Sequence, residues 1–259
     1  MKKEQIPGQM TLIPLMVDFG NKVYMSNELV VGRQDLSLNS TKTLRVLFSK
    51  VLKDDLDFKE YSIGVSELAK ALNTSTSCIS RDAMKIVNEL AFRGLCIKSP
   101  SGRIDAINWA PTSVYDPENS EFHFKLNERL APYLLGLEDY FTCYSLDVAR
   151  EFRSVYGLRL YELLKKENYG ADFSINHPTN VYLSVKDIRF ACALDDYDAN
   201  GNMTKSRLVT TAHLKQRLIN PAIAEIAKVF PTLTVTYEPK SAGSRTVGFF
   251  FKITPLGVK

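Results

Sequence analysis

The segment HLKQRLINPAIAEIAK (His213–Lys228) carries a continuous apolar face opposite a polar face with little bulk. At about 100° per residue, one side collects Leu214, Leu218, Ile219, Ala222, Ile223, Ile226 and Val229. The other side collects His213, Gln216, Arg217, Asn220 and Lys228, with only Ala224 and Ala227 between them. The pattern predicts a helix that rests on a core and offers hydrogen-bonding groups to a phosphate backbone and base edges, although a solvated surface helix shows the same pattern. Pro221 lacks an N–H and should kink this helix or start a new one.

Positive charge is concentrated in the part of the chain that holds this segment. The net charge is +4. From Phe141 onward there are sixteen lysines and arginines against eleven aspartates and glutamates, whereas the preceding part has seventeen against eighteen. A local basic excess favours a polyanionic partner.

The composition is typical of a globular protein with one large or two ordinary domains: 259 residues, 45% hydrophobic and 24% charged. There is no apolar run of the roughly 18 residues that a membrane span needs. The N-terminal MKKEQIPGQM has no apolar core after its lysines, which argues against a secretory signal. The four cysteines (Cys78, Cys96, Cys143 and Cys192) form no CxxC pair and fit free thiols in a reducing cytoplasm.

Upstream, the pattern after a loosely ordered lead-in (residues 1–26) predicts a winged helix-turn-helix. The expected elements are an Asn27-capped helix to Val31, a helix at Ser40–Lys53, a strand at Tyr61–Val65, a Ser66-capped helix at Glu67–Leu72, a turn at Asn73–Ser75, a helix at Thr76–Arg93 ended by Gly94, and strands at Leu95–Lys98 and Arg103–Trp109 joined by Pro100-Ser101-Gly102. The second helix of such a pair reads a major groove. Its solvent side carries Ser77, Arg81, Lys85 and Asn88.

The same order of elements recurs toward the C-terminus. After strands at Ser113–Tyr115 and Phe122–Leu126, a helix at Asn127–Leu137 and a passage at Glu138–Tyr144, we expect a helix at Leu146–Glu167, a strand at Val181–Leu183, a Ser184-capped helix at Val185–Leu194, a polar loop at Asp195–Lys205, a helix at Ser206–Lys228, and strands at Leu233–Tyr237 and Thr246–Ile253 joined by the polar Glu238–Arg245. The prediction is an α+β fold of two tandem winged-helix domains, residues 27–140 and 141–259. Two such domains in one chain could bind two successive major grooves of one DNA duplex, which repeat about every 34 Å.

Several stretches form a recognisable set: LDVAREFRSVYGLRLYELLKK (Leu146–Lys166), HLKQRLINPAIAEIAK, VTYEPK (Val235–Lys240), YSIGVSELAKALN and FHFKLNERLAPYLLGL. Together they resemble the plasmid replication initiators of the Rep_3 type over about residues 27–254. GLRLYELLKK and LKQRLINPAIAEI are the most specific parts, and the family accepts the proline within its second reading helix. One departure is Ala227, which stands where the family usually has an asparagine after "EI".

The resemblance implies a monomer that binds repeated origin sequences (iterons) with both reading helices in the major groove. It also implies strand opening beside the repeats and recruitment of the host replicative helicase and a DnaA-type initiator. A dimer, formed through the first domain, would repress the initiator's own promoter. The expected partners are therefore double-stranded plasmid origin DNA with direct repeats, those host proteins and a second copy of the chain, in the bacterial cytoplasm with the plasmid and nucleoid, and with no cofactor and no membrane.

Carried onto this sequence, the second-domain contacts are expected first from Lys215, Gln216, Arg217 and Asn220, and after them from His213, Lys205 and Arg207. Arg217 is the best base reader, because a guanidinium can bond guanine O6 and N7 together. Lys215 lies toward the apolar arc and more naturally reaches a phosphate. In the first domain, Arg81 is the comparable residue and Lys85 the phosphate contact. Wing residues Arg103, Lys240 and Arg245 are expected at the backbone or minor groove, and each of these side chains is equally explained as a solvated polar group.

Patterns of enzyme chemistry are missing from the sequence. His123, His177 and His213 form no HxH or HExxH pair, and there is no GxxxxGK[ST] loop. DYDANG (Asp196–Gly201) matches half of a calcium loop, but Arg207 stands where a bidentate glutamate is needed. We therefore predict no enzyme and no metal site. Two alternatives stay open: a transcription regulator, which an inverted repeat would favour, and a protein-interaction module, whose affinity for DNA would lack a steep salt dependence.

Overall fold

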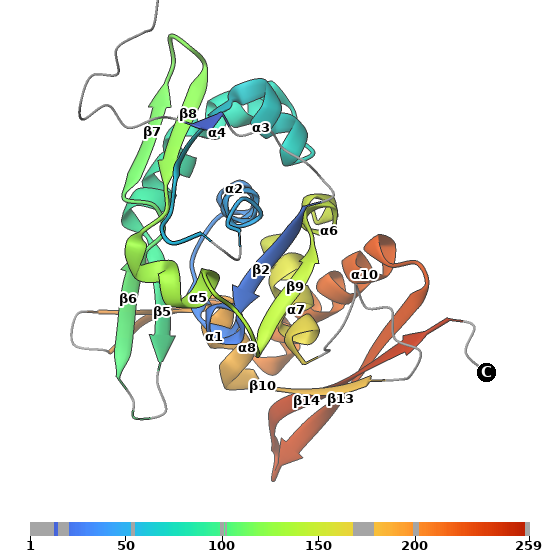
Figure 1. Cartoon of the computed structure of the whole chain (residues 1–259). Helices are drawn as coiled ribbons and strands as arrows, with labels where there is room; N and C mark the ends of the chain where they lie inside the picture. Colours follow the sequence, from blue (N-terminus) through green and yellow to red (C-terminus); the bar gives the residue numbers. More distant parts are fainter. Residues whose placement is uncertain are drawn as a thin grey trace, which may run out of the picture.

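The computed structural model describes residues 13–14, 21–52, 55–98, 101, 103–167, 179–198 and 202–256. Figure 1 shows two α+β units packed side by side, the first rich in blue and green and the second in yellow to red. The expected lead-in at residues 1–12 and 15–20, the turn residues Pro100 and Gly102, His177 and the end of the DYDANG loop lie outside the described residues. The expected domain boundary between residues 140 and 141 stays a prediction.

Helix α2 (Leu38–Phe48) runs through the middle of the first unit (Figure 1). Every residue from Ser40 to Phe48 is buried, including Lys42 and Arg45, so the helix is covered on all sides. The expected extension to Lys53 is wrong, because the helix ends at Phe48 and a turn follows. Its cationic side chains are used internally: Lys42 donates to backbone carbonyls, and Arg45 binds Glu162.

The first unit contains the predicted helix-turn-helix and a sheet. Its elements are β4 (Glu60–Gly64), α3 (Val65–Ala71), α4 (Thr76–Phe92), β7 (Thr112–Asp116) and β8 (Glu121–Lys125). The strands are hydrogen-bonded in the order β1–β4–β8–β7, where β1 is Ile13–Pro14. α3 begins one residue before the expected Ser66 cap, with Gly64 at the cap position and no side-chain hydrogen bond there.

Further elements surround this unit. They are β2 (Lys22–Ser26), α1 (Asn27–Val31), β3 (Arg33–Gln34), β5 (Gly94–Lys98), β6 (Ile104–Asn108), a 3₁₀ turn (Glu128–Leu130), α5 (Ala131–Leu134) and β9 (Phe141–Ser145). β2 pairs with β9, so the expected lead-in contains a strand and the expected passage ends in one. Ser26, rather than Asn27, caps α1 by accepting from the Leu29 N–H. The expected long helix at Asn127–Leu137 is only the 3₁₀ turn followed by α5.

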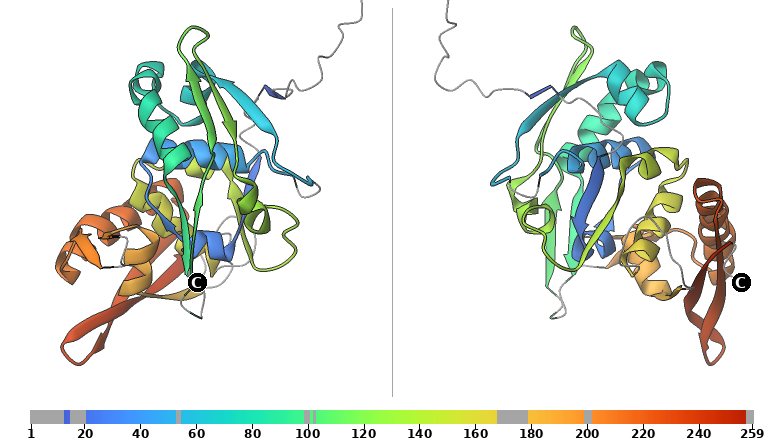
Figure 2. Two further views of the ribbon diagram at one scale, coloured as in Figure 1. Left: turned by 90° about the vertical axis from the view of Figure 1, so that its left-hand side faces the viewer. Right: turned by 45° about the vertical axis from the view of Figure 1, so that its right-hand side comes forward.

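The second unit repeats strand, helix pair and hairpin. Its elements are α6 (Leu146–Glu151), α7 (Val155–Lys166), β10 (Thr179–Ser184), α8 (Val185–Ala191), β11 (Asp195–Tyr197), β12 (Met203–Ser206), α9 (Thr211–Leu214), a π-helical turn (Lys215–Ile219), α10 (Asn220–Val229), β13 (Leu233–Ala242) and β14 (Arg245–Pro255). The expected single helix at Leu146–Glu167 is broken after Glu151. The expected polar loop at Asp195–Lys205 includes the paired strands β11 and β12. The β13–β14 hairpin projects from the opposite end of the molecule to the β7–β8 hairpin (Figure 2).

A fully buried polar cluster joins α2 to α7. The Glu162 carboxylate accepts from Arg45 at 2.7 and 3.0 Å, from Arg159 at 2.6 Å and from the Tyr144 hydroxyl at 2.6 Å. Arg159 also donates to the carbonyl of Ala191 in α8 at 3.4 Å. Burial opposes the charge on Glu162, but the two arginines outweigh it and lower its pKa to about 2. The cluster therefore stays ionised and ties helices of both units to one another.

Candidate nucleic-acid interface

The C-terminal reading segment is three consecutive helical pieces: α9, the π-helical turn and α10. Thr210 caps it, because its hydroxyl oxygen accepts from the His213 N–H at 3.1 Å. The expected start at Ser206 is wrong, since Ser206 ends strand β12 and pairs with Asp195. The cap lies four residues later, after Leu208, which adopts a positive φ of 51°.

Pro221 shapes the middle of this segment. It has no N–H to donate to the carbonyl four residues earlier, and its ring crowds that carbonyl. The π-helical turn just before Pro221 accommodates the missing hydrogen bond and the crowded carbonyl. In this turn the Asn220 N–H donates to the carbonyl of Lys215, five residues earlier. The helix therefore continues through the proline with a local change of register, and α10 begins with proline in its first turn.

The two faces predicted from the sequence are borne out in their burial. Leu214, Leu218, Ile219, Ala222 and Ile226 are buried, while Ile223 and Val229 are half-buried. The polar residues on the opposite side are exposed: His213, Gln216, Arg217, Asn220 and Lys228. Lys215 is half-buried at the border between the two faces, as predicted from its position close to the apolar residues.

One residue of the exposed face is oriented by the hairpin. The Asn220 side-chain oxygen accepts from the Tyr237 hydroxyl of β13 at 2.8 Å. The reading segment and the hairpin of the second unit are thus held in a fixed relation.

The reading helix of the first unit is α4, which Ser75 caps by accepting from the Cys78 N–H at 3.2 Å. The residues predicted to contact DNA are all exposed: Ser77, Arg81, Lys85 and Asn88. Ser80 and Met84 share this face and were missed, although the same helical spacing would have included them.

The Arg81 side chain is 72% exposed and contacts neighbours on its own helix. Its Nε lies 3.1 Å from Asp82 Oδ1, and its guanidinium donates to Cys78 Sγ at 3.2 Å. Partial burial would raise the pKa of Asp82, but hydrogen bonds from Arg81 and Asn39 lower it below the ordinary value. The carboxylate stays charged and pairs with Arg81 on the surface of the helix.

Strand pairing identifies the wing of each unit. In the second unit, the strand before the helix pair (β10) is hydrogen-bonded to the last strand of the hairpin, giving the order β10–β14–β13. In the first unit, β4 pairs in the same way with β8, giving β4–β8–β7. The wing is therefore β7–β8, and the expected wing at Leu95–Lys98 and Arg103–Trp109 is wrong. Those residues form a separate hairpin that pairs with β3.

The two wings differ in charge. Asp116, Glu118 and Glu121 lie around the β7–β8 turn, where Asp116 accepts from the backbone N–H groups of Glu118 and Asn119 at 2.9 and 3.2 Å. The β13–β14 wing instead carries the exposed cations Lys240 and Arg245.

Lys240 is additionally held on the outer face of its sheet. Its ammonium lies 4.8 Å from the centroid of Tyr182 and 5.6 Å from that of Phe250. These two rings form a directly paired cross-strand contact between β10 and β14. A cation seated on aromatic rings loses part of its mobility, so Lys240 has a defined position on the wing.

The remaining predicted contacts lie outside the reading helices and wings. Arg103 precedes β6 and donates to Asp105 at 2.9 Å. Lys205 is exposed on β12. Arg207, expected within the reading helix, lies in the connection before it, donates to the carbonyl of Ala193 and sits 3.6 Å from Asp35 of the first unit. Its guanidinium is therefore committed to contacts inside the molecule.

The described ranges contain no group of three or more His, Cys, Asp or Glu side chains placed to share a metal ion. In the DYDANG match, Asp196 pairs with Arg33 at 2.9 Å, and Asp198 accepts from the backbone and side-chain nitrogens of Asn202 at 2.8 and 3.2 Å. Within the same described ranges, no helix combines the length and apolarity that a membrane crossing requires.

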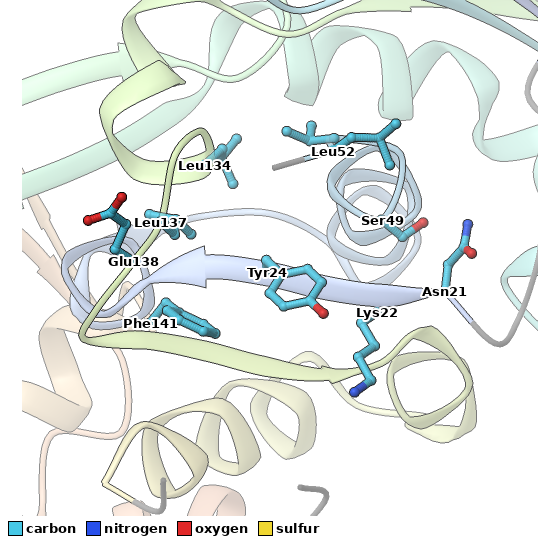
Figure 3. A pocket seen from close by; sticks show the side chains of 10 residues that line it. Asn21, Lys22, Tyr24, Ser49, Leu52, Leu134, Leu137, Glu138 and Phe141 are labelled. Atoms are coloured by element: carbon cyan, nitrogen blue, oxygen red, sulfur yellow. The ribbon is translucent and has the colours of Figure 1, made fainter. Parts of the chain in front are cut away.

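A pocket of about 600 Å³ lies between β2, β9, α5 and the end of α2 (Figure 3). Tyr24, Phe141, Leu134 and Leu137 line it, and Leu52 faces it from the end of α2. None of the predicted DNA contacts lines this pocket. It is separate from the candidate interface.

Comparison with known proteins agrees with this architecture. Residues 22–165 match the family profile "Initiator Replication protein, WH1", and residues 184–253 match "Initiator Rep protein, WH2". A replication initiation protein from Escherichia coli is 25% identical over 179 residues, which cover 67% of this chain and 55% of that protein, so the chain spans about half the length of this curated relative. The crystal structure of the Pi initiator protein in complex with iteron DNA superposes with a TM-score of 0.73 at 19% identity, covering 93% of this chain and 100% of that one.

The superposition supports the two winged-helix units, and the two profiles together match most of the sequence in the same order as those units. The resemblance noted from the sequence is thereby confirmed: the chain belongs to the Rep_3 family of replication initiator proteins.

Proposed function

We propose that this protein initiates plasmid replication by binding directly repeated origin DNA through two winged-helix units. The observation that carries the proposal is the doubled geometry: α4 and α9–α10 each present an exposed polar face at the same place in a strand–helix–helix–hairpin unit. A recognition helix of this kind enters a major groove, and two in one chain suit two successive grooves. The Pi initiator, which is similar in fold, was crystallised with iteron DNA.

Within this proposal, the second unit is the main DNA-binding unit. Arg217 contacts base edges, whereas Lys215, Lys240 and Arg245 contact phosphates. In the first unit Arg81 reads bases after leaving Asp82, and Lys85 contacts a phosphate. Ser77, Asn88, His213, Gln216 and Asn220 supply further hydrogen bonds, and Arg103, Lys205 and Arg207 are the weakest candidates because of where they lie.

We further propose the partners that family membership suggests. They are the host replicative helicase, a DnaA-type initiator and a second copy of the chain, the last forming a dimer that represses the initiator's own promoter. The protein would act beside the plasmid in the bacterial cytoplasm and by binding rather than by catalysis, since its exposed polar faces match DNA-reading surfaces.

The test is footprinting on the non-coding DNA of the cognate plasmid. We expect protection of a run of direct repeats, weakened by Arg217→Ala by about 5- to 150-fold in affinity, the range for losing one bidentate base contact. Arg81→Ala should weaken it less, because separating the exposed Arg81–Asp82 ion pair offsets part of the contact energy in the native protein. Arg129→Ala, an exposed arginine that donates to the Ala106 carbonyl, is the matched control. Protection unchanged by both Arg217→Ala and Arg81→Ala would refute the residue assignment.

Two alternatives give different results in the same assays. A transcription regulator would protect an inverted repeat at a promoter and no run of direct repeats. A protein-interaction module would bind duplex DNA without the steep loss of affinity between about 50 and 200 mM salt that six or more phosphate contacts produce. The exposed cations of the second reading helix and wing favour the steep salt dependence.

A further inference from the structure

The corner between α6 and α7, residues 150–154, lies between the two reading helices. In Figure 1 it sits between α3 at the top and α10 at the right. The corner exists because α6 ends at Glu151 and α7 starts at Val155, with Phe152 buried in the break. The corner is hydrogen-bonded both to the turn that leads into α4 and to α10.

On the side of the first unit, the corner holds the turn before α4. The Arg153 guanidinium donates to the carbonyl of Asn73 at 2.8 Å. The Lys42 ammonium bridges the same two segments, donating to the carbonyl of Leu72 at 3.0 Å and to that of Arg150 at 2.6 Å. Cations are favoured at the C-terminal end of a helix, which here is the end of α3. These bonds hold the turn before α4 against the corner.

On the side of the second unit, the corner is held by α10. The Glu225 carboxylate accepts from the backbone N–H groups of Arg153 and Ser154, the latter at 3.1 Å. α10 approaches so closely that a Cβ at Gly157 would overlap this carboxylate. Gly157 is thus the residue that lets Glu225 reach the corner.

We propose that Arg153 and Glu225 form a joint that fixes the separation of the two reading helices, and thereby sets the spacing between the two groups of bases that one molecule recognises. The proposal deepens the function proposed above and rests on it. Arg153 is the shared member, because its side chain binds the turn before α4 while its backbone N–H binds α10. Both are positioning residues in this scheme, and neither needs to touch DNA.

The physical consequence follows from the geometry of B-DNA. One extra base pair between the two recognised groups moves the second group by about 3.4 Å and turns it by about 34° around the axis. A rigid joint cannot follow this change, so one reading helix must lose its contacts. A loosened joint can follow part of the change, so it should bind altered spacings better without gaining any new contact.

The experiment compares the full-length protein on a set of single repeats in which one base pair is added or removed between the two footprinted halves. Wild type should bind the natural spacing at least about tenfold more tightly than either altered one. Arg153→Ala and Glu225→Ala should keep the natural affinity within about threefold and reduce this preference to about threefold or less. Glu225→Gln keeps an oxygen that accepts both N–H groups, so it should retain the wild-type preference.

Two further variants separate the joint from a general loss of stability. Gly157→Ala leaves Arg153 and Glu225 unmutated but adds a methyl group that displaces the Glu225 carboxylate, so it should relax the spacing preference as Glu225→Ala does. Arg129→Ala, which removes a similar arginine-to-carbonyl bond elsewhere, should not. Unchanged spacing preference in Arg153→Ala, Glu225→Ala and Gly157→Ala overturns the joint even when wild type protects direct repeats. If wild type itself fails to bind such repeats, the proposed function fails instead.

Discussion

Replacing Glu162 with glutamine should expose how much the buried polar cluster contributes to stability. The side chains of Glu162 and Arg45 have 0% exposure, and that of Arg159 has 1%. Glutamine keeps the volume but removes the negative charge, which leaves two buried guanidinium groups without a counter-ion. Breaking a buried pair in this way typically costs about 3–5 kcal/mol. We therefore expect the free energy of unfolding at pH 7 to fall by about that amount in Glu162→Gln.

The pKa of Glu162 gives a second, independent magnitude. A folded-state pKa of about 2 instead of 4.5 corresponds to about 3 kcal/mol, at about 1.36 kcal/mol per pH unit. Because the folded-state pKa is depressed, this stability is fully present above pH 4.5 and is lost as the pH falls from 4.5 toward 2. In Glu162→Gln this component of the acid dependence should be missing.

The assay is urea unfolding at pH 7, 4.5 and 3 and at constant ionic strength. Far-UV circular dichroism follows the whole chain, and the single tryptophan, Trp109, is buried and reports the first unit. Glu128→Gln is the control, since that side chain is 78% exposed. A loss below about 1 kcal/mol at pH 7, or an acid dependence equal to that of wild type, would refute the reasoning.

Three further predictions follow from single contacts. Gly94→Ala should destabilise the protein by more than about 2 kcal/mol, because the added Cβ would overlap the backbone carbonyl of Ile107. Gly64→Ala should be nearly neutral, because apart from its chain neighbours no atom lies within 4 Å of the added Cβ. Thermal unfolding of the two variants measures the difference. Pro221→Ala should change the free energy of unfolding by no more than about 1 kcal/mol but lower DNA affinity about tenfold. The restored N–H lets the π-helical turn tighten, and this rotates the exposed polar face of the reading segment. Unfolding and DNA-binding titrations measure the two effects. Lys240→Ala should weaken binding to all sequences alike and reduce the slope of log affinity against log salt by about 1.

The elements predicted well from the sequence are those whose signals are local. α4 was placed to within a residue because its apolar spacing is regular and a turn precedes it. The faces of the C-terminal reading segment were also predicted correctly, since four of its apolar residues recur at intervals of four. Helix α10 even keeps the predicted faces beyond Pro221, because the π-helical turn accommodates the proline locally.

The features that were missed depend on partners far away in the chain. The order of elements in the sequence places the wing of the first unit at the hairpin directly after α4, β5–β6, whereas β4 pairs with β8, about sixty residues later. The break between α6 and α7 was missed because the N–H groups it frees are satisfied by Glu225, more than seventy residues away. Apolar periodicity continues across the break, so the sequence reads as one helix. The bonds from Arg153 to Asn73 and from Glu225 to the α6–α7 corner are equally long-range, so no local pattern predicts them.

The wings of the two winged-helix units differ in charge, and this difference affects the kind of DNA site that the protein can bind. Acidic side chains surround the turn of the β7–β8 wing, so that turn is repelled by phosphates and the first unit depends on α4 for its contacts. The β13–β14 wing instead carries the exposed cations Lys240 and Arg245, so the second unit offers positive charge on its wing as well as on its reading segment. A chain in which one DNA-binding unit has a basic wing and the other an acidic wing has no twofold symmetry. A single molecule therefore matches an asymmetric DNA sequence. The inequality of the wings therefore favours an asymmetric sequence over a palindrome as the site of one monomer.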